Sequence, residues 1–275
     1  MAAQDDAAAP GRQPDSVHHY GPNPSQYAEL YVPSERRLPG VIVIIHGGFW
    51  RDTYDASLGH PLAADLVRRG WVVWNLEYRR TTDAEVRGPD TGGWPETFED
   101  VSAGIDALGP VLAEAGLERG HVVVLGHSAG GHLAAWAAGR HKLPAGAPGA
   151  EPAVKVDGVV SQAGVLELWM ANWLKLSHSA AVKLMEVTSE EDPRRWQLAD
   201  PVRMLPIGVP VIAVHGKSDA DVPSALSRAY TDAARAQGDP ARMVFTTGDH
   251  QALITPGTPA WDACLVALAE LAVPA

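Results

Sequence analysis

The chain has a single cysteine in 275 residues and no apolar run long enough to cross a bilayer. Cys264 has no partner for an internal disulfide, and its apolar, helically spaced surroundings predict a small buried side chain. A membrane-spanning helix needs roughly 18 to 20 apolar residues, and the N-terminus lacks the basic and apolar regions of a secretory leader. These absences predict a cytoplasmic protein with no membrane partner.

Positive charge is also scarce. Lys and Arg number 22 against 33 Asp and Glu, which gives a formal net charge of −11. Because such a surface repels polyanions on average, we expect no nucleic-acid partner. With 46% hydrophobic and 20% charged residues, the composition is that of a globular protein. The sequence does not decide the oligomeric state and leaves a homodimer open.

Apolar segments alternate with amphipathic ones from residue 41 to the end. This alternation predicts an α/β fold with a mostly parallel central sheet and helices on both faces. We expect a mobile tail at 1–20, one domain at 21–275 and a helical lid inserted at about 166–200. Strands are predicted at 27–33, 41–45, 71–78, 156–165, 209–216 and 242–250, and a strand, tight turn and helix at 121–139. The other helices are predicted at 60–70, 98–116, 166–187, 224–238 and 258–272.

The segment GHSAG at 126–130 carries the clearest chemical signal. It is a G-x-S-x-G pattern placed directly between an apolar strand and a helix. In that setting the serine occupies a sharp, strained turn, and the flanking glycines remove side chains that would collide there. Ser128 is therefore the predicted nucleophile, and the N–H of Ala129 faces developing negative charge at the helix N-terminus.

A serine hydroxyl needs a base, and the base needs a carboxylate to fix its tautomer. His250 follows the last predicted strand, and the loop KSDADVP at 217–223 follows the strand before it. We predict His250 as the general base and Asp219 as the orienting carboxylate. Asp221 is the alternative, with a turn or helix-cap role if Asp219 is the partner of His250.

The segment HGGFW at 46–50 directly follows VIVII, the most uniformly β-branched run of the chain. Acyl transfer passes through an oxyanion that needs more than one N–H donor, and glycines let a backbone approach the substrate oxygen. We predict an oxyanion hole made of the N–H groups of Gly48, Phe49 and Ala129. Pairs of residues with metal-ligand spacing and phosphate-binding glycine motifs are absent from the sequence, so neither a metal nor a cofactor is predicted.

These segments together with DHQALI at 249–254 resemble the α/β-hydrolase superfamily over residues 27–272. Within it, hormone-sensitive-lipase-like esterases carry H-G-G-G, and this chain has Phe49 in place of the third glycine. Kynurenine formamidases of this fold carry H-G-G-x-W with G-H-S-A-G-x-H, and Trp50 and His132 stand at those places. Gly131 stands where these formamidases commonly have alanine.

The formamidase resemblance implies hydrolysis of N-formyl-L-kynurenine to kynurenine and formate. The substrate would be a small acyl compound with an aryl leaving group, for which aromatic walls are available in Trp50, Trp94, Trp169 and Trp173. A carboxylesterase on short-chain acyl esters is the alternative, and a non-catalytic binding protein of the same fold is a remoter one. Arg79 and Arg80 follow a strand and either meet a substrate carboxylate or pair with a residue such as Glu77. The sequence offers no account of Arg51.

Overall fold

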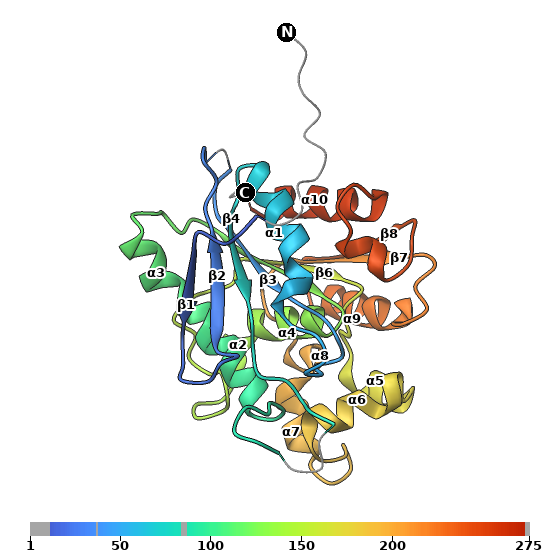
Figure 1. The fold of residues 1–275 in the computed structure, drawn as a ribbon. Helices are drawn as coiled ribbons and strands as arrows, with labels where there is room; N and C mark the ends of the chain where they lie inside the picture. Colours follow the sequence, from blue (N-terminus) through green and yellow to red (C-terminus); the bar gives the residue numbers. More distant parts are fainter. Residues whose placement is uncertain (1–11, 37, 84–86, 273–275) are drawn as a thin grey trace.

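A central sheet organises the protein (Figure 1). The computed structural model describes residues 12–36, 38–83 and 87–272, and in these residues one sheet has the strand order β1-β2-β4-β3-β5-β6-β7-β8. Pairing is antiparallel between β1 and β2 and between β2 and β4, and parallel in every other pair. The strands are β1 (Ser16–His19), β2 (Tyr27–Tyr31), β3 (Val41–Ile45), β4 (Val72–Leu76), β5 (Val122–His127), β6 (Gly158–Gln162), β7 (Val211–Gly216) and β8 (Ala241–Thr246).

Helices cover both faces of this sheet (Figure 1). They are α1 (His60–Arg68), α2 (Glu96–Asp106), α3 (Leu108–Glu114), α4 (Ala129–Ala138), α5 (Leu168–Trp173), α6 (Leu176–Met185), α7 (Pro193–Ala199), α8 (Pro201–Met204), α9 (Ser224–Ala236) and α10 (Pro259–Leu271), with 3₁₀ turns η1 (Ala56–Gly59), η2 (Arg140–Lys142) and η3 (Gln251–Ile254). On one face Ile42 and Ile44 pack with α1 and α10. On the other face Val41, Val43 and Ile45 pack with α2, α4 and α9.

The strand β3 shows why an unbroken apolar run marks the centre of the sheet. It pairs in parallel with β4 on one side and β5 on the other, and all five of its residues are buried. A strand covered on both faces has no polar side to show in its sequence. The carboxyl ends of β3, β5, β7 and β8 lie at one edge, so the loops that leave them meet there.

Two sequence predictions of local structure are corrected. The predicted tail at 1–20 contains β1, which pairs with β2, and Tyr20 OH donates to the carbonyl of Glu77 at 2.6 Å. Residues 1–11 of that tail lie outside the described residues. The helix predicted at 98–116 is two helices, α2 and α3, and Pro110 has no N–H to continue the hydrogen bonding of α2 into α3.

The segment predicted as one helix at 166–187 is also divided. Between α5 and the regular part of α6, Lys175, Ser177, His178 and Ser179 have positive φ angles of 46° to 59°. Residues other than glycine adopt such backbone angles only where surrounding contacts hold them. One such contact comes from Arg51, whose Nη2 donates to the carbonyl of Ser177 at 2.5 Å. The role of 166–200 as a lid stays a prediction.

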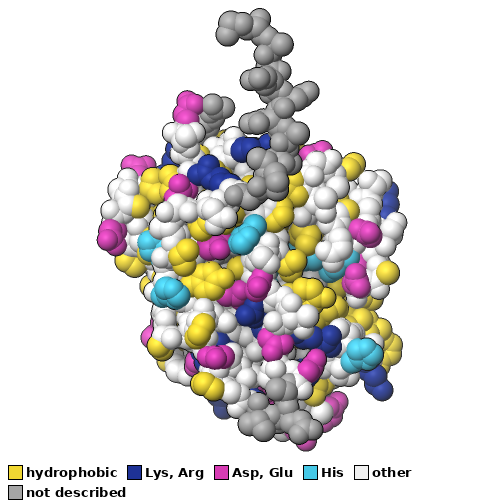
Figure 2. All heavy atoms as spheres, viewed as in Figure 1, with side chains coloured by type: hydrophobic (Ala, Val, Ile, Leu, Met, Phe, Trp, Pro, Cys, Tyr) yellow, Lys and Arg dark blue, Asp and Glu magenta, His cyan; other side chains and the backbone are white. Residues whose placement is uncertain are grey.

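The net negative charge is not gathered into one patch on the face that Figure 2 shows. Acidic side chains there are scattered among basic and apolar ones. Within the described residues, no helix combines the length and apolar character that a bilayer crossing requires.

Candidate active site

The segment around Ser128 forms a tight turn between β5 and α4. Ser128 has φ 54° and ψ −116°, far from helix or strand values, and is 2% exposed. A Cβ at Gly126 would lie 2.2 Å from the carbonyl oxygen of Gly130. A Cβ at Gly130 would lie 2.0 Å from the carbonyl oxygen of Ile45. The two glycines of the G-x-S-x-G pattern therefore let the turn close on itself and on β3.

This close packing predicts that Gly130→Ala strongly destabilises the protein. The new methyl group would collide with backbone of β3, which cannot move aside as a side chain can, so we expect a loss of about 3 kcal/mol or more in the free energy of unfolding. Chemical denaturation measures this loss. Gly109→Ala in α3 is the matched control, because its Cβ would meet only Val154 at an ordinary 3.5 Å. Equal stability of the two variants would contradict this account of the turn.

A histidine and a carboxylate meet beside this turn. His250 follows β8 and Asp219 follows β7, and His250 Nδ1 lies 2.7 Å from Asp219 Oδ2. The other carboxylate oxygen of Asp219 accepts the N–H groups of Asp221 and Val222, each at 2.9 Å. Burial alone would raise the pKa of Asp219, but the hydrogen bonds from His215 and His250 outweigh it and hold this pKa well below its usual value. Asp219 is thus a fixed, ionised acceptor for the ring of His250.

Ser128 and His250 line one small pocket of ≈ 120 Å³. Within the described residues no hydrogen bond joins Ser128 Oγ to the ring of His250, and such bonds are commonly long without substrate. Gly48 and Phe49 line the same pocket, so the structure brings the HGGFW segment to the serine. The full lining is Gly48, Phe49, Tyr54, Leu58, His127, Ser128, Asp221, His250, Gln251 and Ile254.

The two glycines of HGGFW let the loop backbone lie close to the side chains of His127 and Tyr54. A Cβ at Gly47 would lie 2.9 Å from His127 Nδ1 and 3.1 Å from the Cβ of Ser128, and one at Gly48, which has φ +106°, would lie 2.6 Å from Tyr54. In the described part of the chain, the N–H groups of Gly48, Phe49 and Ala129 donate to no protein acceptor. Three free donors therefore lie near Ser128, two on the loop after β3 and one at the first residue of α4, as an oxyanion would require.

A buried carboxylate, which the sequence indicated only as a possible partner of Arg79 or Arg80, holds this loop. Glu77, 1% exposed, lies 3.1 Å from His46 Nε2 through Oε1 and accepts the N–H of Ala56 at 2.7 Å through Oε2. Arg80 Nη1 lies 2.9 Å from Glu77 Oε1. His46 Nδ1 in turn lies 2.9 Å from the carbonyl oxygen of Gly47. The signal in the sequence was an acidic residue directly after the buried strand at 72–76.

The arginines near this edge make structural contacts. Arg79 binds Asp100 with two nitrogens, at 2.8 and 2.7 Å, so it is not free to meet a substrate carboxylate. Arg80 pairs with Glu77, and Arg51 reaches Ser177 as described above. These contacts agree with the alternative in which Arg79 and Arg80 form structural ion pairs and do not bind a substrate carboxylate. The partner of Arg79 is Asp100.

His127, the residue before Ser128, makes packing and hydrogen-bonding contacts with His250. Its ring packs on that of His250 with centroids 4.4 Å apart, and its Nε2 lies 3.1 Å from the carbonyl oxygen of His250. Burial, together with the nearby charge of His250, lowers the pKa of His127 to about 3. His127 is therefore a neutral ring that supports His250 from within the elbow.

The four tryptophans proposed as aromatic walls do not line this pocket. For Trp50 the prediction is wrong: its side chain is 1% exposed, and its ring packs edge-on against His132 at 5.2 Å. Trp94 packs on Phe98, Trp169 lies under the guanidinium of Arg203 at 4.2 Å, and Trp173 is 79% exposed. Sequence spacing could not separate these packing roles from substrate contact, because both use large aromatic rings.

Trp50 and His132 are also the residues on which the formamidase resemblance depended. Their contact in the core accounts for both without a substrate. At Gly131, a Cβ would lie 2.6 Å from the Cα of Gly164, so alanine, common in the formamidases, would be crowded here.

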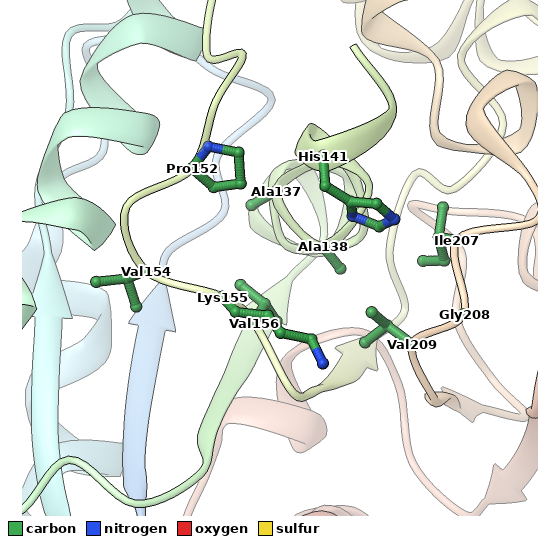
Figure 3. Close-up of a pocket in the computed structure, with 10 residues that line it drawn as sticks. All are labelled: Ala137, Ala138, His141, Pro152, Val154, Lys155, Val156, Ile207, Gly208 and Val209. Carbon is green, nitrogen blue, oxygen red and sulfur yellow. The ribbon is translucent and has the colours of Figure 1, made fainter.

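A larger cavity of ≈ 450 Å³ lies away from Ser128 (Figure 3). Its walls come from the end of α4 and from the segments that enter β6 and β7, such as Val156 and Val209. It therefore lies at the amino-terminal edge of the sheet, opposite the loops that carry Ser128, Asp219 and His250. Among the described residues that line it, only His141 and Lys155 are ionisable, and no serine, threonine or cysteine accompanies them. The smaller pocket is therefore the candidate site.

Comparison with curated proteins finds esterases among those similar to this chain. The chain is similar to Esterase LipQ of Mycobacterium tuberculosis, 29% identical over 74% of this chain and 47% of LipQ. It is also similar to the isoprenylcysteine alpha-carbonyl methylesterase ICME of Arabidopsis thaliana, 27% identical over 83% of this chain and 54% of that protein. The chain thus spans about half the length of these relatives.

Solved structures show the same architecture. A truncated carbohydrate esterase from gut microbiota superposes with a TM-score of 0.74 at 19% identity, over 95% of this chain and 99% of the other. Esterase B from Lactobacillus rhamnosis gives 0.72 at 22% identity, over 94% and 86%. The predicted α/β-hydrolase fold is confirmed. The family model BD-FAE matches residues 28–233, which is more than half of the sequence, so the chain belongs to the BD-FAE family.

Proposed function

We propose that the protein is a serine esterase acting on short-chain acyl esters. The observation that carries the proposal is the pairing of His250 with Asp219 at 2.7 Å in a pocket shared with the strained Ser128. The esterases among its relatives support the reaction class. The small volume of the pocket, ≈ 120 Å³, favours a short acyl chain, since pockets for drug-sized ligands are several times larger.

Each step of the proposed reaction is assigned to a residue of the site. Ser128 Oγ attacks the ester carbonyl carbon while His250 accepts its proton, and Asp219 stays ionised and stabilises the imidazolium. The N–H groups of Gly48, Phe49 and Ala129 bind the oxyanion of the tetrahedral intermediate. The intermediate expels the alcohol, which takes the proton from His250. Water, deprotonated by His250, then attacks the acyl-enzyme, and the second intermediate releases the carboxylic acid as Ser128 Oγ takes the proton back from His250.

The neutral ring of His127 and the carboxylate of Glu77 act through other residues in this scheme. His127 fixes the position of the His250 ring and its carbonyl. Glu77 fixes His46, and with it the loop that supplies two oxyanion donors. Both are positioning residues, and neither touches the reacting atoms.

The second candidate, hydrolysis of N-formyl-L-kynurenine, is tested directly against the first. We expect kcat/KM for p-nitrophenyl acetate and butyrate to exceed that for N-formylkynurenine by about 100-fold or more, because the tryptophans suggested for the aryl group are absent from the pocket. Spectrophotometric assays measure both substrates, with Ser128→Ala as the control for uncatalysed hydrolysis. Formamide turnover equal to or faster than ester turnover would support the formamidase and reject the ester preference.

A further inference from the structure

One carboxylate in the candidate site has no partner. Asp221 is exposed and lines the pocket that holds Ser128 and His250. One of its carboxylate oxygens lies within 4.8 Å of a ring nitrogen of His250 and of a carboxylate oxygen of Asp219. The alternative role as a helix cap is not observed, since α9 begins after Pro223 with no side-chain cap bond. Within the described residues, the side chain of Asp221 makes no hydrogen bond or ion pair.

The rest of the pocket supplies no positive charge to balance it. None of the other described residues that line the pocket is a lysine or arginine. His127, with a pKa lowered to about 3, is neutral at physiological pH. The chain as a whole carries a formal charge of −11. A substrate that enters this pocket therefore meets a net negative field that attracts cations and repels anions.

Two aromatic rings line the same small pocket. Phe49 and Tyr54 both belong to the loop after β3, and Tyr54 is 47% exposed. In the part of the chain that the structure describes, no lysine or arginine lies over either ring. Aromatic faces beside an unpaired carboxylate are the combination that binds alkylammonium groups, through cation–π attraction and charge pairing.

We propose that the pocket selects esters bearing an alkylammonium group, with Asp221 as the charge partner and Phe49 and Tyr54 as the aromatic walls. The inference deepens the proposed esterase function and rests on it for the reaction. Asp221 is a specificity-determining residue in this account: it takes no proton and forms no bond to the substrate, and it changes which esters reach Ser128.

The test uses two butyrate esters of the same shape and different charge. Butyrylcholine carries the cation, and 3,3-dimethylbutyl butyrate has carbon in place of the quaternary nitrogen. For the wild-type chain at low ionic strength, we expect kcat/KM to favour butyrylcholine by about tenfold. Asp221→Asn should bring this ratio close to one, and Asp221→Glu should restore part of it. Asp232→Asn, which removes an exposed carboxylate from α9, should keep the wild-type ratio.

A binding arm separates this inference from the esterase proposal. NMR titration compares choline with 3,3-dimethylbutan-1-ol on the wild-type chain and on the same variants, with no turnover required. Preferential choline binding that Asp221→Asn removes supports the inference even if neither ester is hydrolysed, and in that case the proposed function alone fails. Equal binding of the two alcohols, or a choline preference that survives Asp221→Asn, overturns the inference.

Discussion

Ser128→Ala is expected to reduce kcat for ester hydrolysis by about 10⁵-fold or more, because the variant has no atom to form the acyl-enzyme. The loss should fall on kcat with little change in KM. The remaining rate would come from the oxyanion donors and from His250 acting on water.

The structure predicts that this variant still folds. The hydroxyl of Ser128 makes no hydrogen bond within the described residues, and the elbow is closed by Gly126 and Gly130 instead. Thermal unfolding should therefore change by only a few degrees. Wild-type levels of hydrolysis by a folded Ser128→Ala chain would show that another residue is the nucleophile.

Asp219→Asn is the second change with a large expected effect. One oxygen of Asp219 accepts the N–H groups of Asp221 and Val222, and the other faces His250. Asparagine keeps the first pair of contacts with its oxygen and turns its amide N–H toward His250. His250 Nδ1 must then accept rather than donate a hydrogen bond, so the proton moves to Nε2, the atom that should take the proton from Ser128.

We therefore expect kcat to fall by about 10⁴-fold for Asp219→Asn, the scale found for the same change in serine proteases. Steady-state kinetics with p-nitrophenyl butyrate measures it. Asp232→Asn, an exposed carboxylate outside the pocket, is the matched control and should behave as the wild-type chain. If Asp219→Asn retained more than about a tenth of the activity, Asp219 would not be the carboxylate that orients His250.

The sequence predicted the elements whose local signals agree with their tertiary setting. VIVII at 41–45 is apolar at every position because β3 is covered on both faces. The GHSAG pattern predicted Ser128 as the nucleophile because the turn requires small residues on either side of the serine. His250 was predictable from chain order, which also limited its carboxylate partner to Asp219 or Asp221, since each loop leaves a strand at the same edge of the sheet.

Other features depended on contacts that no short segment contains. Trp50 stands next to the oxyanion loop in sequence, yet its ring enters the core against His132, which is 82 residues further along the chain. The role of Glu77 is apparent only from its contacts with His46 and Ala56. The left-handed backbone around Ser177 opposes the preference of its own residues, so only contacts such as that with Arg51 can explain it. Packing of this kind overrides local propensity and is invisible in a single sequence.

The central claim is that Ser128 becomes acylated during ester hydrolysis. Rapid acid quenching of the wild-type chain with p-nitrophenyl butyrate, followed by mass spectrometry of its peptides, tests this most directly. The account predicts one butyryl group on the peptide that contains Ser128, formed in a burst with the first equivalent of p-nitrophenol and absent from Ser128→Ala. Brisk ester hydrolysis with no acyl group at Ser128, or with the group on another residue, would contradict it.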